Sequence, residues 1–358
     1  MKDNQIVDGI SINKIKKSKI SSIDFDNLVF GHIFSDHMFV ADYYNNIWND
    51  MTIIPYNTIN IYPSLNALHY GQIIFEGLKA YKHKNGKIVL FRPNDNFIRF
   101  NLSANRMCMP GIDKETFMNA IINLLKIDRN WIYNKRGYSL YIRPFMFATD
   151  TYLGIKPSKK YKFIIFSTPS NLYYKNPLKI KIENYYTRSV KGGTGYIKSG
   201  CNYGIALYPT QLAINEGFDQ VLWTDYKTHE YIEELSTANI FFVIDNTLWT
   251  PNTKDTILNG ITRDSIIKIA KNIINIKVYE TNIKVDFLIN AIKNKNLQEA
   301  FAVGTAATIT KVSKIGYKNN IYNLPFNKFS ISDKILLYLK NIFYGESTDY
   351  FKWLVYLD

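Results

Sequence analysis

The sequence predicts a two-domain protein of the α+β or α/β class. With 358 residues, the chain is long enough for two domains that each have their own core. Hydrophobic residues make up 46% of it and aromatic residues 15%, which excludes a disordered chain. Segments with helical or strand periods occur on both sides of residues 170–178, where neither period is present. We therefore expect a small N-terminal domain of residues 1–169, a linker over 170–178 and a larger C-terminal domain of residues 179–358.

Charge and composition narrow the functional classes. The net charge is +14, but the lysines are spread along the whole chain, so no nucleic-acid partner is expected. The two cysteines, Cys108 and Cys201, lie far apart and the five histidines are scattered, so neither a disulfide framework nor a metal site is expected. No apolar run is long enough to span a bilayer, and no apolar segment follows the basic residues 13–19. We expect a cytoplasmic protein without a membrane partner.

The N-terminal half is expected to begin with strands and turns. Between residues 28 and 62, apolar runs alternate with turn residues such as Asn45-Asn46. Arg99 lies at the edge of the apolar face of a later helix, from which its guanidinium could reach a phosphate. Tyr141 and Arg143 share one face of a strand; such a pair suits a carboxylate or is merely a pair of surface residues. The expected helices cover residues 94–108 and 114–128, and the expected strands cover 138–147 and 161–166.

The C-terminal half alternates strands with helices. Glu233 and Glu234 stand directly before an apolar strand. A carboxylate there needs a partner such as the protonated ring nitrogen of a pyridine cofactor, unless both side chains lie in a solvated turn. A glycine turn opens a helix over 258–273 with Thr262 as its N-cap, and a later strand runs into the turn Gly304-Thr305-Ala306. The amides of these two turns, together with Arg99, would suit a phosphate. The other expected elements are strands at 178–183 and 220–225, a helix at 210–215, and a final helix capped by Ser332 and ended by Gly345.

Lys198 is the candidate nucleophile of the chain. It lies three residues after Gly195 and two before Gly200, and glycines permit a close approach of two backbones. A lysine desolvated in such a turn loses its proton near neutral pH and can attack an aldehyde, as Schiff-base chemistry requires. A Walker A loop is excluded because Ile197 precedes the Lys-Ser pair, and a dinucleotide fingerprint is excluded because Lys198 occupies the place of its third glycine. Taken by itself, the segment also fits a solvated lysine, which is the commoner case.

Eight short segments carry a family resemblance. They are FGHIFSDHM, LHYGQIIFEGLKA, FRPNDNFIR, LYIRP, GYIKSGCNYG, EELSTANIF, LNGITRDS and VGTAATIT. Their order and spacing resemble those of the branched-chain amino acid aminotransferases, members of the class IV, fold-type IV family of pyridoxal-phosphate enzymes. The resemblance extends from about Phe30 to the C-terminal helix. It implies a small N-terminal α/β domain and a larger, β-barrel-like C-terminal domain with helices.

The resemblance implies cofactor roles for residues of both expected domains. Lys198 would bind pyridoxal 5'-phosphate covalently and, once displaced by substrate, carry a proton between the reacting carbons. Glu234, rather than Glu233, would keep the pyridine nitrogen protonated, and Tyr203 would bond the phenolic oxygen. The phosphate would be held by Arg99, by the amides of Ile261 and Thr262, and by Thr305.

The resemblance also implies a substrate site and a homodimer. The amides of Thr305 and Ala306 would bind the α-carboxylate, and Arg143, with Tyr70 and Tyr141, is our hypothesis for the partner of the second carboxylate of glutamate. In the family, the residues matching Tyr70, Leu153 and Ile155 reach in from a second subunit, so a homodimer, possibly within a larger assembly, is expected. The apolar side-chain pocket would be walled by Phe30, Phe75, Tyr141 and Thr237.

The implied reaction is a reversible transamination between L-leucine, L-isoleucine or L-valine and 2-oxoglutarate. Its products are branched 2-oxo acids and L-glutamate. D-amino acid aminotransferase and aminodeoxychorismate lyase share the lysine, the glutamate and the phosphate site, so they remain alternatives with the same fold. A basic binding protein for RNA or membranes, with a degenerate site, is the alternative from another class.

Overall fold

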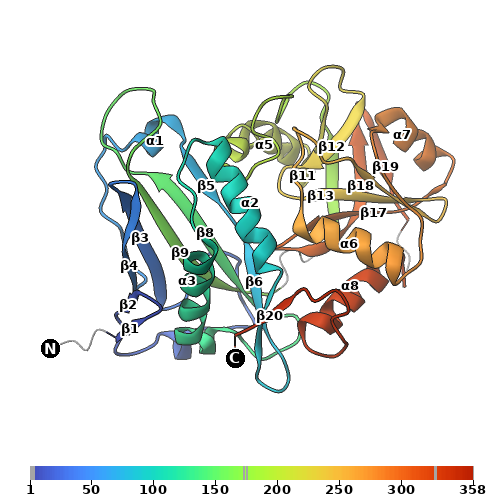
Figure 1. The fold of residues 1–358 in the computed structure, drawn as a ribbon. Helices are drawn as coiled ribbons and strands as arrows, with labels where there is room; N and C mark the ends of the chain where they lie inside the picture. The colour runs from blue at the N-terminus through green and yellow to red at the C-terminus, as the bar shows by residue number, and fades with distance from the viewer. Residues whose placement is uncertain (1–4, 172–173, 175, 326–328, 358) are drawn as a thin grey trace. The chain divides into compact units, whose positions relative to one another are not determined.

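A computed structural model describes residues 5–171, 174, 176–325 and 329–357. The chain forms two compact units (Figure 1). The first comprises Met1–Tyr173, Lys198–Gly200 and Asn341–Asp358, and the second comprises Tyr174–Ile197 and Cys201–Lys340. Three residues of the expected linker, 172, 173 and 175, lie outside the described residues, and the division of the chain at 170–178 stays a prediction. The short segment around Lys198 and the C-terminal segment are counted with the first unit, so the first unit is the longer of the two.

The first unit is built on one ten-stranded, mostly antiparallel sheet (Figure 1). Strands β3 (His37–Tyr44) and β4 (Ile47–Pro55) are joined by Asn45 and Asn46, whose φ angles of 53° and 63° match the two-residue turn of a twisted hairpin. The turn predicted there is confirmed, but the first of these strands begins only at His37, so the apolar residues 28–34 lie before it. In spatial order the strands are β1 (Gln5–Val7), β2 (Ile10–Ile12), β4 (Ile47–Pro55), β3 (His37–Tyr44), β9 (Tyr161–Ser170), β8 (Ser139–Ala148), β6 (Leu78–Lys82), β7 (Ile88–Phe91) and β20 (Leu354–Tyr356), with β5 (Ile73–Phe75) paired to β8.

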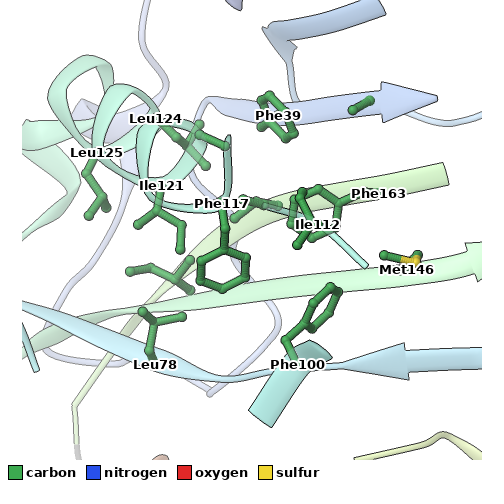
Figure 2. Close-up of a cluster of buried hydrophobic side chains, with 14 of the residues drawn as sticks. Phe39, Leu78, Phe100, Ile112, Phe117, Ile121, Leu124, Leu125, Met146 and Phe163 are labelled. Atoms are coloured by element: carbon green, nitrogen blue, oxygen red, sulfur yellow. The ribbon is translucent and has the colours of Figure 1, made fainter. Parts of the chain in front are cut away.

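Two helices, α2 (Pro93–Arg106) and α3 (Lys114–Ile127), pack on this sheet and close the core of the first unit. Figure 2 shows Phe100 and Phe117 next to Phe163, with ring centroids 5.3 and 6.2 Å from that ring. These side chains are fully buried, and each buried aromatic ring contributes roughly 1.5–3 kcal/mol of hydrophobic stabilisation. The shorter helices of the unit are η1 (Ile20–Ser22), α1 (Asn66–Tyr70) and η2 (Arg129–Trp131).

The second unit contains a second ten-stranded sheet, which mixes parallel and antiparallel pairs. One core cluster of this unit takes alternate residues of the central strands, which point to the same face, and it includes Ile180, Phe242 and Ala302. The strand order is β15 (Val278–Thr281), β14 (Thr247–Pro251), β13 (Asn239–Ile244), β17 (Leu297–Gly304), β18 (Thr308–Tyr317), β10 (Leu178–Ile182), β11 (Gln220–Thr224), β12 (Tyr231–Leu235) and β16 (Ile283–Lys284), with β19 (Asn320–Asn323) paired to β18. The helices are α4 (Cys201–Gly204), α5 (Leu207–Asn215), α6 (Ile261–Asn272), α7 (Val285–Lys293) and α8 (Ile331–Phe343), whose last three residues are counted with the first unit.

The helices and strands expected after residue 90 are confirmed, with ends that differ by a few residues, but two predicted N-caps are wrong. Gly260 precedes α6, so Thr262 lies inside the helix rather than at its cap. Helix α8 begins at Ile331, and the carboxylate of Glu299 on β17 accepts from the amides of Ile331 (2.7 Å) and Ser332 (3.2 Å). Ser330, the residue before the helix, is the local cap: its Oγ atom accepts from the amide of Asp333 (3.4 Å), and the carboxylate of Asp333 accepts from the amide of Ser330 (3.1 Å). The cap predicted at Ser332 is therefore two residues too late. Within the described ranges, no helix has the length and apolar content that crossing a bilayer would require.

Candidate active site

The segment that carries Lys198 pairs with the sheet of the first unit. The amide of Phe75 donates to the carbonyl oxygen of Lys198 (3.0 Å), and the amide of Gly200 donates to that of Ile73 (3.2 Å), so residues 198–200 run alongside β5. Gly200 lies so close that a Cβ atom there would be 2.8 Å from Cγ2 of Ile73. The close backbone approach predicted at the glycines is confirmed here.

Two cations lie over the ring of Phe75. The Nζ atom of Lys198 is 4.8 Å from the ring centroid, and the Cζ atom of Arg143 is 4.7 Å from it. Arg143 donates through Nη2 to the hydroxyl oxygen of Tyr141 (3.1 Å), whose ring meets that of Phe30 edge-on at 5.1 Å. Five residues predicted for the site are thus brought together within one unit. We refer to Phe30, Phe75, Tyr141, Arg143 and Lys198 as the Phe75 cluster.

The hydroxyl of Tyr141 occupies the place where a side chain of Gly77 would be. A Cβ atom at Gly77 would lie 2.0 Å from the hydroxyl oxygen and 2.7 Å from Cζ of the ring. Tyr141 is only 6% exposed, and Phe30 and Arg143 pack against it, so its ring can move away only if these contacts are disturbed. Gly77 is therefore required for the position of Tyr141.

Arg99 is paired with Glu76, a residue that sequence reasoning missed. The Nε and Nη2 atoms of Arg99 donate to the two carboxylate oxygens at 2.6 and 2.9 Å, and Asn96 donates to the same carboxylate at 2.7 Å. Burial by itself raises the pKa of Glu76, but the charges of Arg99 and Lys198 and these hydrogen bonds outweigh it, so that the pKa is lowered. The carboxylate therefore stays ionised. The sequence did contain a signal for this pair: a glutamate within an apolar segment needs a cation as its partner.

Three predicted substrate residues are exposed in the described part of the chain and do not join the Phe75 cluster. Tyr70 is 42% exposed, Leu153 is 71% exposed and Ile155 is 91% exposed. These are the residues for which the family resemblance implies a second subunit. Their exposure leaves large apolar side chains without a covering surface in the single chain.

Glu234, in the second unit, is held by a second residue that the sequence analysis missed, Arg188. Glu234 is 5% exposed on β12, and it accepts hydrogen bonds from Arg188, from Asn239 Nδ2 (3.1 Å) and from the amide of Leu258 (3.1 Å). The guanidinium of Arg188 also donates to the carbonyl oxygen of Thr256 (2.7 Å). The alternative that Glu234 lies in a solvated turn is wrong, because β12 is buried from Ile232 to Leu235.

Glu233 is buried next to Glu234, but its carboxylate lacks a full set of hydrogen-bond partners. It is 6% exposed, and its Oε2 atom has no hydrogen-bond partner among the described residues. Burial raises the pKa of Glu233 to about 7, against the opposing effects of a hydrogen bond with Thr256 and the charge of Arg188. Glu233 is therefore an acid that titrates near neutrality. The solvated-turn alternative is wrong for this residue as well.

The other predicted residues of the second unit lie at turns and helix starts. Ile261 and Thr262 are the first two residues of α6, where backbone amides have no acceptor within the helix. Thr305 and Ala306 form the turn between β17 and β18, and both are half-buried. Tyr203 lies in α4, and Thr237 accepts from Gln220 Nε2 at 2.9 Å.

Gly260, which precedes α6, carries no capping side chain. A Cβ atom there would lie 2.0 Å from Oδ1 of Asn239. The start of this helix therefore depends on a glycine packed against the residue that also holds Glu234.

No metal site is found among the described residues. None of their groups of three or more His, Cys, Asp or Glu side chains could hold a metal ion.

The fold and these residues define a class of enzyme. The family model for class IV amino-transferases matches residues 73–315, which include β5, Lys198, Glu234 and the turn after β17. The chain therefore belongs to the class IV aminotransferases.

Named relatives show which kind of class IV aminotransferase this chain is. The chain is 40% identical to branched-chain-amino-acid aminotransferase 2 of Bacillus subtilis (strain 168) over 96% of its length and 95% of the relative. It also resembles the crystal structure of the Escherichia coli branched-chain amino acid aminotransferase, with 25% identity, a TM-score of 0.74, and coverage of 90% of this chain and 99% of that one. The PLP-form of the Thermobaculum terrenum branched-chain amino acid aminotransferase shares the fold, with 20% identity and a TM-score of 0.72 over 90% and 98% of the two chains. Within its class, this chain is one of the branched-chain-amino-acid aminotransferases.

Replacing Gly77 by alanine is expected to displace Tyr141. The new methyl group would overlap the tyrosine hydroxyl, and such overpacking costs about 1–3 kcal/mol. We expect the free energy of unfolding of Gly77→Ala, measured by urea denaturation, to fall by that amount. Gly204→Ala is the control, because nothing lies within 4 Å of a Cβ atom there. Equal stability of both variants and the parent would contradict this account of Gly77.

Glu233→Gln is expected to change how stability depends on pH. Because the folded-state pKa of about 7 is above the ordinary value of 4.5, the folded chain binds more protons between these values, and stability falls as the pH rises through them. The variant should exceed the parent by about 3 kcal/mol in free energy of unfolding at about pH 8 and lose this advantage toward about pH 5. Urea denaturation at both pH values tests this. The exposed Glu230, just before β12, supplies the control Glu230→Gln, and a difference that did not change with pH would contradict the prediction.

Proposed function

We propose that this chain catalyses the reversible transfer of an amino group between L-leucine, L-isoleucine or L-valine and 2-oxoglutarate. The names of its relatives support this reaction. The observation that carries the proposal is the shared position of Lys198 and Arg143 over the ring of Phe75. A primary amine and a guanidinium beside an apolar ring are the groups that an enzyme acting on apolar amino acids and on glutamate requires.

The buried residues of the chain fit pyridoxal 5'-phosphate as the cofactor. When bound, this group supplies an electron sink for the carbanion formed at the α-carbon. Glu234 is a buried carboxylate, so it suits a protonated ring nitrogen, and Tyr203 is assigned to the phenolic oxygen. Lys198 would hold the cofactor covalently and later move the proton at the α-carbon. Arg99, the first amides of α6 at Ile261 and Thr262, and Thr305 are assigned to the phosphate.

The substrate is proposed to be oriented by its carboxylates and its side chain. The amides of Thr305 and Ala306 would donate to the α-carboxylate. Phe30, Phe75, Tyr141 and Thr237 would exclude water from the aliphatic side chain. Arg143 and the hydroxyl of Tyr141 would receive the second carboxylate of glutamate, which an apolar wall alone cannot hold.

We also propose that the chain works as a homodimer. The exposed side chains of Tyr70, Leu153 and Ile155 support this, because a second copy would cover them. The cytoplasmic location expected from the sequence stays a prediction. D-amino acid aminotransferase, aminodeoxychorismate lyase and a basic binding protein remain as outcomes of the assay below.

The decisive experiment is a transamination assay on purified protein with added pyridoxal phosphate. 2-Oxoglutarate is paired with L-leucine, L-valine, D-alanine or no donor. We expect glutamate from the two L-amino acids and none from Lys198→Ala, because that variant lacks the amine. Activity with D-alanine alone would overturn the substrate assignment. Absence of activity, together with no cofactor absorbance that depends on Lys198, would favour the binding-protein alternative.

Arg143→Gln is expected to raise the KM for glutamate much more than the KM for leucine. Loss of a charged hydrogen-bond donor costs about 1.5–3 kcal/mol, which corresponds to a KM for glutamate and 2-oxoglutarate about 10- to 100-fold higher. The KM for leucine should change much less, since leucine has no second carboxylate. Steady-state kinetics with each substrate measure both values, with the exposed Arg129→Gln as the matched control. Equal losses for glutamate and leucine would exclude this role of Arg143.

A further inference from the structure

We propose that Glu76 is a positioning residue that fixes the guanidinium of Arg99 in the orientation needed to bind a phosphate. The inference rests on the proposed function, because it takes Arg99 to be a phosphate ligand. The reaction as described gives Glu76 no part. The geometry around its carboxylate nevertheless links it to Arg99 and to the segment of Lys198.

The backbone of Glu76 is held from two directions. Its amide donates to the carbonyl oxygen of Pro144 on β8 at 2.7 Å, and the amide of the preceding Phe75 donates to the carbonyl oxygen of Lys198 at 3.0 Å. The side chain is fully buried. The backbone of Glu76 is therefore fixed next to residues 198–200, so its side chain can hold Arg99 in place.

The carboxylate of Glu76 accepts hydrogen bonds at both of its oxygens. Oε1 accepts from Nε of Arg99 at 2.6 Å. Oε2 accepts from Nη2 of Arg99 at 2.9 Å, from Asn96 Nδ2 at 2.7 Å and from the amide of Gly77 at 3.0 Å. Because Asn96 and Arg99 are one turn apart on α2, the same helix supplies both side-chain donors.

This arrangement fixes the plane of the guanidinium. Two parallel N–H···O bonds to one carboxylate remove the rotations that a long arginine side chain otherwise has. A guanidinium has five N–H donors, and these two bonds use one on Nε and one on Nη2. Glu76 thus orders Arg99 before any anion binds, so less conformational freedom is lost on binding.

A rival explanation is that Glu76 only neutralises a buried charge. The two roles differ in what a shorter acid would do. Aspartate keeps the charge but cannot reach both Nε and Nη2 from the same backbone position. A positioning role predicts that Glu76→Asp behaves like Glu76→Gln, whereas simple charge compensation predicts that it behaves like the parent.

The test compares the affinity of the full-length protein, freed of cofactor, for pyridoxal phosphate and for pyridoxal. In both Glu76→Gln and Glu76→Asp, the dissociation constant for pyridoxal phosphate should rise about 10- to 100-fold, as expected for a disrupted charged hydrogen bond. For Glu76→Asp, which keeps the negative charge near Lys198, the constant for pyridoxal, which has no phosphate, should stay within about threefold of the parent. In an Arg99→Gln background, either change at Glu76 should have no further effect on the preference for the phosphate.

The matched control is Asp95→Asn. Asp95 pairs with Nε and Nη2 of Arg92 at 3.0 Å in the same side-on geometry, also on α2, but it is outside the proposed site. This variant should bind both ligands as the parent does. If the Glu76 variants fail to fold by circular dichroism, Asn96→Ala removes one of the bonds that hold Glu76. Asn96→Ala should then show a smaller loss, again for pyridoxal phosphate alone.

Three outcomes would overturn the inference. These are unchanged or tighter binding of pyridoxal phosphate, an equal loss for pyridoxal, and parent-like behaviour of Glu76→Asp. Failure of the proposed function is distinguishable, since the parent protein itself would then show neither transamination nor absorbance of bound cofactor that depends on Lys198.

Discussion

The backbone pairing between residues 198–200 and β5 is the constraint on which the candidate site depends. Ile74 and Ser199 form a β-bridge, and Ser199 Oγ donates to the carbonyl oxygen of Ile73 at 3.1 Å. Strand β5 is in turn paired with β8, which carries Tyr141 and Arg143. One ladder of backbone bonds therefore sets the positions of the lysine, the aromatic wall and the guanidinium. A slip of one residue would turn the side chains of a strand to its other face.

The two buried carboxylates, Glu76 and Glu234, are stabilised in the same way. Each accepts from an arginine, from the Nδ2 atom of an asparagine and from a backbone amide. Such a set offsets the large cost of removing a carboxylate from water, which an ion pair alone does not always offset. Burial raises the pKa of Glu233 to about 7, because Glu233 has no comparable set of partners to offset it. Their arginine and hydrogen-bond partners, rather than the degree of burial, thus distinguish Glu76 and Glu234 from Glu233.

Sequence reasoning predicted what depends on local pattern. The periods of the apolar residues indicated α2, α3 and β8, and Asn45-Asn46 indicated a hairpin turn because its residues tolerate positive φ. It missed Glu76 and Arg188, whose partners lie 23 and 46 residues away. It also placed two helix caps wrongly: Gly260 rather than Thr262 precedes α6, and Ser330 rather than Ser332 accepts from the amide of Asp333 at the start of α8. Short-range periodicity does not indicate which side chains from distant parts of the sequence contact each other.

The sequence by itself determined the class of the protein and much of its order of helices and strands, and it predicted which side chains react. It did so because family motifs and periodicity are properties of neighbouring residues. Only the tertiary structure decided that Lys198 and Arg143 share one ring, that Gly77 makes room for Tyr141, and that Arg99 is held by Glu76. These are contacts between strands and helices far apart in the chain, and sheet pairing and close packing bring them together.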